Sequence, residues 1–171
     1  NWGGGVGLDG VEITDIELNP DGTELWAATM SGPALSQDGG LTWKMERTGF
    51  PELDDMGYTA PLSAIAIDPD FPDILIAFGG VHPTWTARDL PRSTAVWRST
   101  DRGNTWSEVA PVADNGTVID GVIVPGESDD VLLAVVEGEG LRRSVDGGAA
   151  WSDVELGGLN PIALATTNSR P

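Results

Sequence analysis

The fold of this chain is decided by the stretch Ser99-Thr-Asp-Arg-Gly-Asn-Thr-Trp106, because the same pattern occurs three times. The other copies are Ser36-Gln-Asp-Gly-Gly-Leu-Thr-Trp43 and Ser144-Val-Asp-Gly-Gly-Ala-Ala-Trp151. The shared pattern is Ser-x-Asp-x-Gly-x-Thr-Trp, and the third copy departs from it only by Ala150 in place of threonine. Five specified positions in a fixed register are far more than this composition would give by chance. The chain is therefore built from repeats.

Each copy of the motif predicts a tight β-hairpin turn. Serine and aspartate side chains accept hydrogen bonds from nearby backbone amides, and glycine at the fifth position supplies the positive φ that such a turn needs. The tryptophan then begins the return strand and can cover the turn with its ring. We therefore assign a structural role to Ser36, Asp38, Gly40, Thr42, Trp43, Ser99, Asp101, Gly103, Thr105, Trp106, Ser144, Asp146, Gly148 and Trp151.

The repeat extends beyond these turns. An apolar stretch that ends in a turn precedes each motif, at 16–20, 65–69 and 122–125. A second apolar stretch follows each of them, at 25–28, 74–77 and 131–134. A third strand then runs into each motif and a fourth leaves from its tryptophan. The repeating unit is therefore a four-stranded antiparallel sheet, which is typical of a propeller blade.

The three motifs resemble the Asp-box, or BNR repeat, of β-propellers. That superfamily includes sialidases, xyloglucan-active hydrolases, sortilin-type receptors and photosystem assembly factors. The resemblance covers nearly the whole chain and implies an all-β fold in a single unit, residues 1–171. We expect blades at about 10–50, 58–110 and 117–157, and the first strand of a further blade at 159–166.

Three blades do not close a ring, since closed propellers have four or more. An open arc would expose sheet edges and apolar blade faces. Three interpretations remain open. The chain is a fragment of a longer propeller, or another chain or copy completes it. Alternatively, residues 2–9 share a fourth blade with the C-terminal strand.

The composition limits the classes of partner that the chain can bind. The net charge of −18 and the sequence pI near 4.1 argue against nucleic acid and against an anionic membrane surface. The chain has no cysteine, and no apolar run reaches transmembrane length. We expect no metal and no cofactor. Because proteins with the Asp-box are mostly exported, the resemblance implies an extracytoplasmic location, periplasmic or secreted, with peripheral attachment to a membrane complex left open.

The spacing of the motifs points to candidate binding loops. Asp38 and Asp101 are 63 residues apart, whereas Asp101 and Asp146 are 45 apart. The extra residues fall mainly in two loops, 49–58 and 79–93, which propeller topology places on the face opposite the motif turns. Long loops in compact domains are often functional. The candidate binding residues in them are Asp54, Asp55, Tyr58, His82, Trp85, Arg88, Asp89 and Arg92.

Two functions fit these loops. Tryptophan and arginine can anchor a protein partner, which favours a non-catalytic scaffold module. Tryptophan can also stack on a sugar while Asp54, Asp55 and Arg88 bind its hydroxyls, which would suit a glycoside hydrolase fragment or a carbohydrate-binding propeller. A sialidase-like mechanism is disfavoured because the arginine triad and the Arg-Ile-Pro segment of that family are not found. We therefore expect the scaffold function first, with no catalytic residue assigned.

Overall fold

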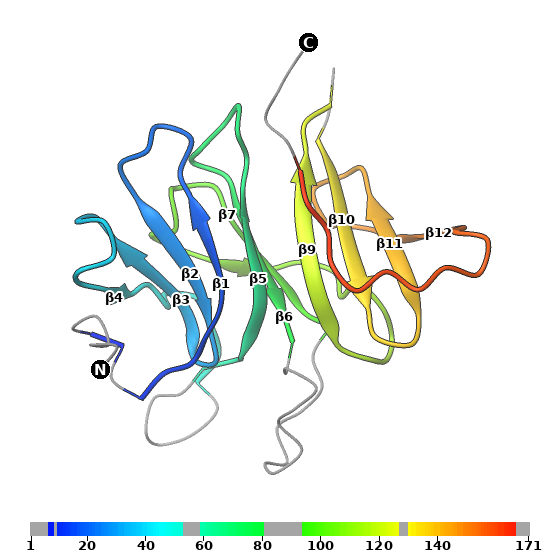
Figure 1. Ribbon diagram of the computed structural model, residues 1–171, viewed down its shortest axis with the longest axis horizontal. Coiled ribbons are helices and arrows are strands. Elements are labelled where there is room, and N and C mark those ends of the chain that lie inside the picture. The colour runs from blue at the N-terminus through cyan, green and yellow to red at the C-terminus, as the bar shows by residue number, and fades with distance from the viewer. Residues whose placement is uncertain (1–6, 9, 53–58, 81–93, 127–129, 167–171) are drawn as a thin grey trace.

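The computed structural model of the chain describes residues 7–8, 10–52, 59–80, 94–126 and 130–166, and all the regular structure in them is β (Figure 1). The first sheet contains β1 (Ile13–Leu18), β2 (Leu25–Thr29), β3 (Gly32–Ser36) and β4 (Lys44–Met45). The second contains β5 (Leu62–Ile67), β6 (Leu75–Gly79), β7 (Val96–Ser99) and β8 (Ser107–Glu108). The third contains β9 (Val118–Val124), β10 (Val131–Val136), β11 (Gly140–Ser144) and β12 (Ser152–Val154).

Each sheet is antiparallel with its strands in chain order. The first strands β1, β5 and β9 lie side by side in the middle of the molecule, while β4 and β12 lie toward its two sides (Figure 1). Between the first two sheets, Asp15 Oδ2 accepts the Ile65 amide at 3.0 Å, and Thr14 Oγ1 donates to the Leu62 carbonyl at 2.8 Å. This arrangement is that of propeller blades around a common axis, so the predicted all-β partial propeller is confirmed.

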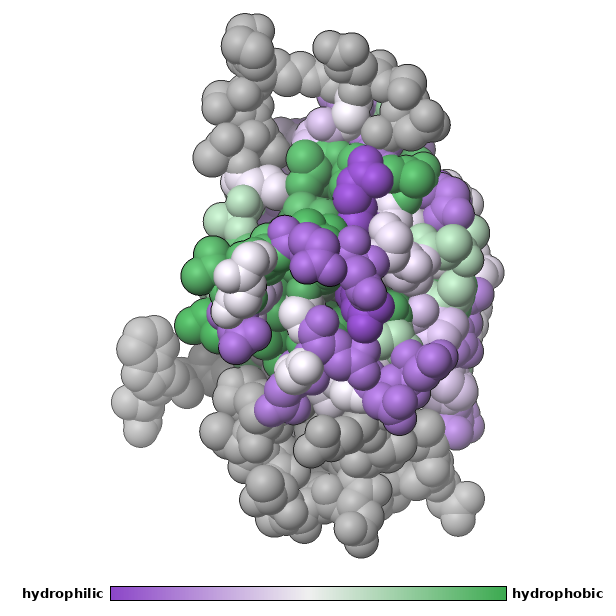
Figure 2. Space-filling model, turned by 90° about the vertical axis from the view of Figure 1, so that its right-hand side faces the viewer, coloured by the Kyte–Doolittle hydropathy of each residue, from purple (hydrophilic) through white to green (hydrophobic). Residues whose placement is uncertain are grey.

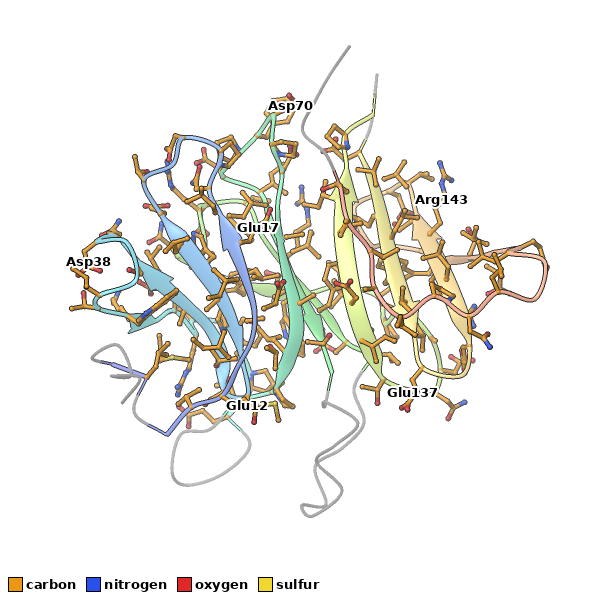
Figure 3. All side chains as sticks on the ribbon, viewed as in Figure 1. Glu12, Glu17, Asp38, Asp70, Glu137 and Arg143 are labelled. Carbon is orange, nitrogen blue, oxygen red and sulfur yellow. The ribbon has the colours of Figure 1, made fainter. Side chains whose placement is uncertain are left out.

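The connections fall at two ends of the molecule. The β1–β2 and β5–β6 turns lie at the same end as the three motif turns, and we call this the box end. The β2–β3 and β10–β11 turns lie at the opposite end, the loop end. Figure 3 shows Asp70 at the box end, and Glu12 and Glu137 at the loop end.

The motif turns are held by their own side chains. In the second motif, Asp101 accepts the Thr105 amide at 2.8 Å and the Thr105 hydroxyl at 2.7 Å. Ser99 Oγ donates to Asp101 and accepts the Gly103 amide, both at 2.8 Å. The first motif has the same contacts, and in the third Asp146 accepts the Ala150 amide at 2.9 Å. The aspartates thus hold backbone in place within the turn.

The tryptophans of the second and third motifs also join neighbouring sheets. The Trp106 indole N–H bonds the Gly103 carbonyl of its own turn at 3.1 Å, but its ring packs edge-on against Trp26 of the first sheet, with ring centroids 6.2 Å apart. Trp151 packs in the same manner against Phe78 of the second sheet, at 6.5 Å. These rings therefore belong to the packing between blades as well as to their turns.

Two buried clusters fill the spaces between the sheets. Trp26, Leu62, Ile65, Trp97 and Trp106 pack between the first and second sheets. Between the second and third sheets the cluster includes the buried side chains Ile76, Phe78, Val96, Val118, Ile123, Leu132 and Val136. A small third cluster packs Leu8 against Ala27 and Ala34 on the other face of the first sheet.

The outer faces of the two end sheets are covered less completely. On β1, Ile16 and Leu18 are 48% and 54% exposed. On the third sheet, Val122, Leu133 and Leu141 are half-buried. Figure 2, which looks at the side of the molecule where β11 and β12 lie, shows hydrophobic residues at the surface among hydrophilic ones.

No strand is assigned to residues 159–166, so the further-blade strand stays a prediction. This segment is nevertheless attached to the third sheet, because the Leu164 amide donates to Asp120 Oδ2 on β9 at 2.6 Å. A strand is recognised by its pairing with another, and this segment has no such partner among the described residues.

Gly103→Ala should destabilise the fold far more than Gly39→Ala. Both glycines have positive φ, +75° and +73°, so alanine at either costs about 1–2 kcal/mol of backbone strain. A Cβ at Gly103 would also lie 2.1 Å from the buried Trp26 ring, whereas a Cβ at Gly39 meets nothing within 4 Å. The clash should add about 1–3 kcal/mol. Urea denaturation measures both variants, and equal losses would contradict this packing.

Ala150→Thr should raise the melting temperature, because it restores the hydroxyl that bonds aspartate in the other two turns. Those bonds are 2.6 Å from Thr42 to Asp38 and 2.7 Å from Thr105 to Asp101. Thr105→Ala should lower the melting temperature by the converse change. Calorimetry on both variants measures how far the bond from threonine to aspartate stabilises the turn. An unchanged melting temperature in both variants would contradict this role.

Candidate functional site

The loop end holds the segments that flank the two predicted binding loops. The Gly80 amide donates to the Pro61 carbonyl at 3.1 Å, so the end of β6 lies beside the residues that lead into β5. Glu52 and Thr59 form an antiparallel bridge across the other loop. The structure therefore brings the flanks of both loops together at this end, opposite the motif turns.

The predicted binding residues themselves lie outside the described part of the chain. These are Asp54, Asp55, Tyr58, His82, Trp85, Arg88, Asp89 and Arg92. Their proposed role in binding a protein or a sugar stays a prediction.

A polar pocket of about 310 Å³ lies between the inner strands, and the sequence analysis did not predict it. Its wall includes the carboxyl groups of Asp15, Glu17 and Asp120, together with Leu164 and Thr166 of the C-terminal segment. Asp15 and Glu17 come from β1, and Asp120 comes from β9. Figure 3 shows Glu17 on β1, in the middle of the molecule.

Two of these carboxylates bond backbone amides of neighbouring segments. Asp15 bonds the Ile65 amide of β5, and Asp120 bonds the Leu164 amide of the segment beside β9. Their other oxygens accept the next amide in their own strands, from Ile16 and from Gly121, both at 2.8 Å. Burial raises the pKa of the Asp120 carboxyl, against the two amides that lower it. Both aspartates therefore have a structural role, because each carboxylate holds two backbone amides.

Glu17 differs from them, because no hydrogen bond to its carboxyl is found among the described residues. Burial, helped by the charge of Asp15, raises the pKa of Glu17 to about 7. Such a carboxyl can donate or accept a proton near neutral pH. Glycoside hydrolysis would also need a second carboxyl across the sugar, whereas Asp15 and Asp120 are both engaged by backbone amides. The pocket therefore holds one carboxyl with a raised pKa, and among the described residues it has no evident catalytic pair.

A sequence signal for this pocket did exist. Aspartate stands at the third position of the inner strand in the first and third repeats, as Asp15 and Asp120, where the second repeat has Ala64. A carboxylate inside an apolar strand is unusual enough to mark a contact or a site.

The described residues hold no group of three or more histidine, cysteine or acidic side chains that could bind a metal ion. Nor do they include any helix with the length and apolarity needed to cross a membrane.

In sequence, the chain is similar to xyloglucanases. It is 31% identical over 162 residues to the xyloglucanase Xgh74A of Acetivibrio thermocellus, an alignment that covers 90% of this chain and 18% of that enzyme. It is 32% identical to a xyloglucanase of Paenibacillus sp. over 115 residues, 63% of this chain and 11% of that enzyme. The chain thus spans less than a fifth of the length of these relatives. No protein-family model matches it.

In structure, the chain is similar to β-propellers. The GH74 enzyme of Niastella koreensis aligns with a TM-score of 0.64 and 23% identity, over 95% of this chain and 23% of that one. YCF48 from Cyanidioschyzon merolae aligns with a TM-score of 0.56 and 17% identity, over 83% of this chain and 36% of that one. A further YCF48 structure at 16% identity is described as bound to D1 peptide. At these identities the likeness establishes the propeller fold and nothing about activity.

The protein should be more stable at pH 5 than at pH 8. The folded pKa of Glu17, about 7, lies above its ordinary 4.5, so the folded state keeps a proton that the unfolded chain releases. This contribution is fully present below about pH 4.5 and is lost as pH rises through about 7. Asp130, whose pKa burial and the Asp68 carboxyl raise to about 6, acts in the same direction.

Glu17→Gln should therefore flatten the fall in melting temperature between pH 5 and pH 8, while the exposed Glu12→Gln should leave it unchanged. Melting curves at each pH provide the measurement. A wild-type slope retained in Glu17→Gln would show that this carboxyl is not buried as described.

Proposed function

Because this chain folds as three blades of a β-propeller, we propose that it forms the polysaccharide-binding blades of a larger glycoside hydrolase that acts on xyloglucan. The observation that carries the proposal is the alignment of 90% of the chain, at 31% identity, with a xyloglucanase. The alignment covers 18% of that enzyme, so the rest of a catalytic propeller would have to come from outside these blades.

The loop end is the surface that suits the polysaccharide. Its two loops carry Trp85 and Tyr58, whose rings can stack on sugar faces, and Asp54 and Arg88, which can bind hydroxyls. The bond from Gly80 to Pro61 supports the view that both loops serve one surface. Xyloglucan is neutral, so the chain's charge of −18 does not oppose its binding. A polymer substrate also implies an extracytoplasmic location, since it does not cross a membrane.

Native electrophoresis in gels that contain xyloglucan tests this proposal. We expect the chain to be retarded by xyloglucan and not by dextran, and Trp85→Ala to abolish the retardation. Phe71→Ala is the matched control, because Phe71 is an aromatic residue 63% exposed at the box end. Retardation that is absent, or equal in dextran, would contradict the proposal. The non-catalytic scaffold module would then be the favoured function.

A further inference from the structure

The connection between β8 and β9 contains the one Asn-Gly pair of the chain, Asn115-Gly116. On one side of this pair, Thr94 Oγ1 donates to the Ala113 carbonyl at 2.6 Å. On the other side, the Glu137 amide donates to the Thr117 carbonyl at 2.9 Å. The turn with Asn115-Gly116 is therefore tied to neighbouring segments at both of its ends.

Within this turn, the reactive groups of Asn115 and Gly116 are not engaged. The Asn115 side chain is exposed, and no hydrogen bond of its amide or of the Gly116 N–H is found among the described residues. Gly116 has φ +98°, and a Cβ there would lie 2.9 Å from Val136 Cγ1. Glycine is therefore the residue that fits this place, and it has no side chain that could cover its own nitrogen.

Such a pair is suited to an intramolecular attack. A backbone nitrogen can add to the side-chain carbonyl carbon of the preceding asparagine, because the succinimide ring that closes is nearly unstrained. The attack requires a nitrogen that can lose its proton and a side-chain amide that can turn toward it. Because both groups belong to one short turn, they react as neighbours rather than as separate molecules.

The other asparagines of the described part lack this arrangement. Asn104 is also exposed, but its side-chain amide donates to the Asp101 carbonyl. The nitrogen that follows Asn104 belongs to Thr105, and its N–H donates to Asp101 Oδ1 at 2.8 Å. Asn19 and Asn160 are each followed by proline, which has no N–H to lose. Among the described asparagines, Asn115 is therefore the one that the fold leaves open to attack.

We propose that Asn115 is a site of spontaneous deamidation, in which the Gly116 nitrogen attacks Asn115 Cγ and displaces ammonia. The bond from this nitrogen to Cγ forms while the Cγ–Nδ2 bond breaks, and the proton of the Gly116 N–H passes through water to the departing amine. Water then opens the succinimide. Attack of water at Cγ gives aspartate, and attack at the backbone carbonyl carbon of Asn115 gives isoaspartate. The only co-reactant is water.

Isoaspartate at this place should loosen the junction between the second and third sheets. It lengthens the backbone by one methylene group inside a turn that is tied at both ends. The extra length must move Gly116 away from Val136 or break the bond from Glu137 to Thr117. This effect is independent of the proposed polysaccharide binding, because neither candidate loop contains Asn115.

Incubation of the chain at pH 8, followed by peptide mass spectrometry and enzymatic methylation of isoaspartate, tests the proposal. We expect the Asn115 peptide to gain the mass of an amide converted to an acid and to contain both products. The reaction should be faster at pH 8 than at pH 6, because hydroxide removes the proton of the attacking nitrogen. In the folded chain the Asn104 peptide should stay intact, whereas in urea it should react, because the bonds to Asp101 are lost.

An intact Asn115 peptide, or an Asn104 that reacts as fast in the folded chain, would overturn the proposal. Aspartate without isoaspartate would contradict the succinimide route, since direct hydrolysis of the side-chain amide gives aspartate alone.

Asn115→Gln should abolish the modification, because glutamine would have to close a larger ring, and Asn104→Gln is the matched control. After incubation, wild type and Asn104→Gln should show a drop in melting temperature that Asn115→Gln does not show. Fresh Asn115→Asp adds the charge without lengthening the backbone, so it should melt above the incubated wild type. Isoaspartyl protein that melts like fresh protein, or Asn115→Asp that melts as low as the incubated wild type, would contradict the loosened junction.

Discussion

The structure depends on one packing constraint, which is that neighbouring sheets must bury the faces that they turn toward each other. The contact between Trp26 and Trp106 shows how the repeats meet it. Gly103 lets the motif turn of one blade lie directly on the Trp26 ring of the preceding blade, where any side chain would collide. The motif therefore fastens its own turn and also forms part of the seam between blades.

The two contacts between neighbouring sheets, which we call seams, are not equivalent, and three repeat positions illustrate the difference. The first seam has Asp15 bonded to the neighbouring inner strand, Trp26 in its core and Arg102 at its box end. The corresponding residues of the second seam are Ala64, Ile76 and Gly147, which are smaller and have no charge. A groove of about 770 Å³ remains where the larger residues are missing. The repeats thus share the same strands, but the side chains that pack between neighbouring sheets differ.

Much of the fold could be predicted because its determinants are local. The serine, aspartate and glycine of each motif define a turn within eight residues, and the alternating apolar strands define the sheets. The inner-strand pocket could not be predicted in the same way. The pKa of Glu17 depends on its burial in a pocket that residues of β5 and β9 also line, and the partner of Asp120 is 44 residues away. The candidate loops at 49–58 and 79–93 contain no repeat pattern, so only their composition and spacing pointed to them.

The third inner-strand position also bears on whether the ring continues. Asp15 pairs with Ala28 of β2, and Asp120 pairs with Val135 of β10, so the two aspartates hold the same place in their blades. Asp15 bonds the amide of Ile65, which lies in the inner strand of the next blade. Asp120 makes the same bond to Leu164, and Ala163-Leu164-Ala165 matches Ala64-Ile65-Ala66 of β5. The prediction that residues 159–166 form the next inner strand therefore has the Leu164 bond in its favour, although these residues pair with no strand among the described ones. A propeller that continues past the third blade accounts for both observations.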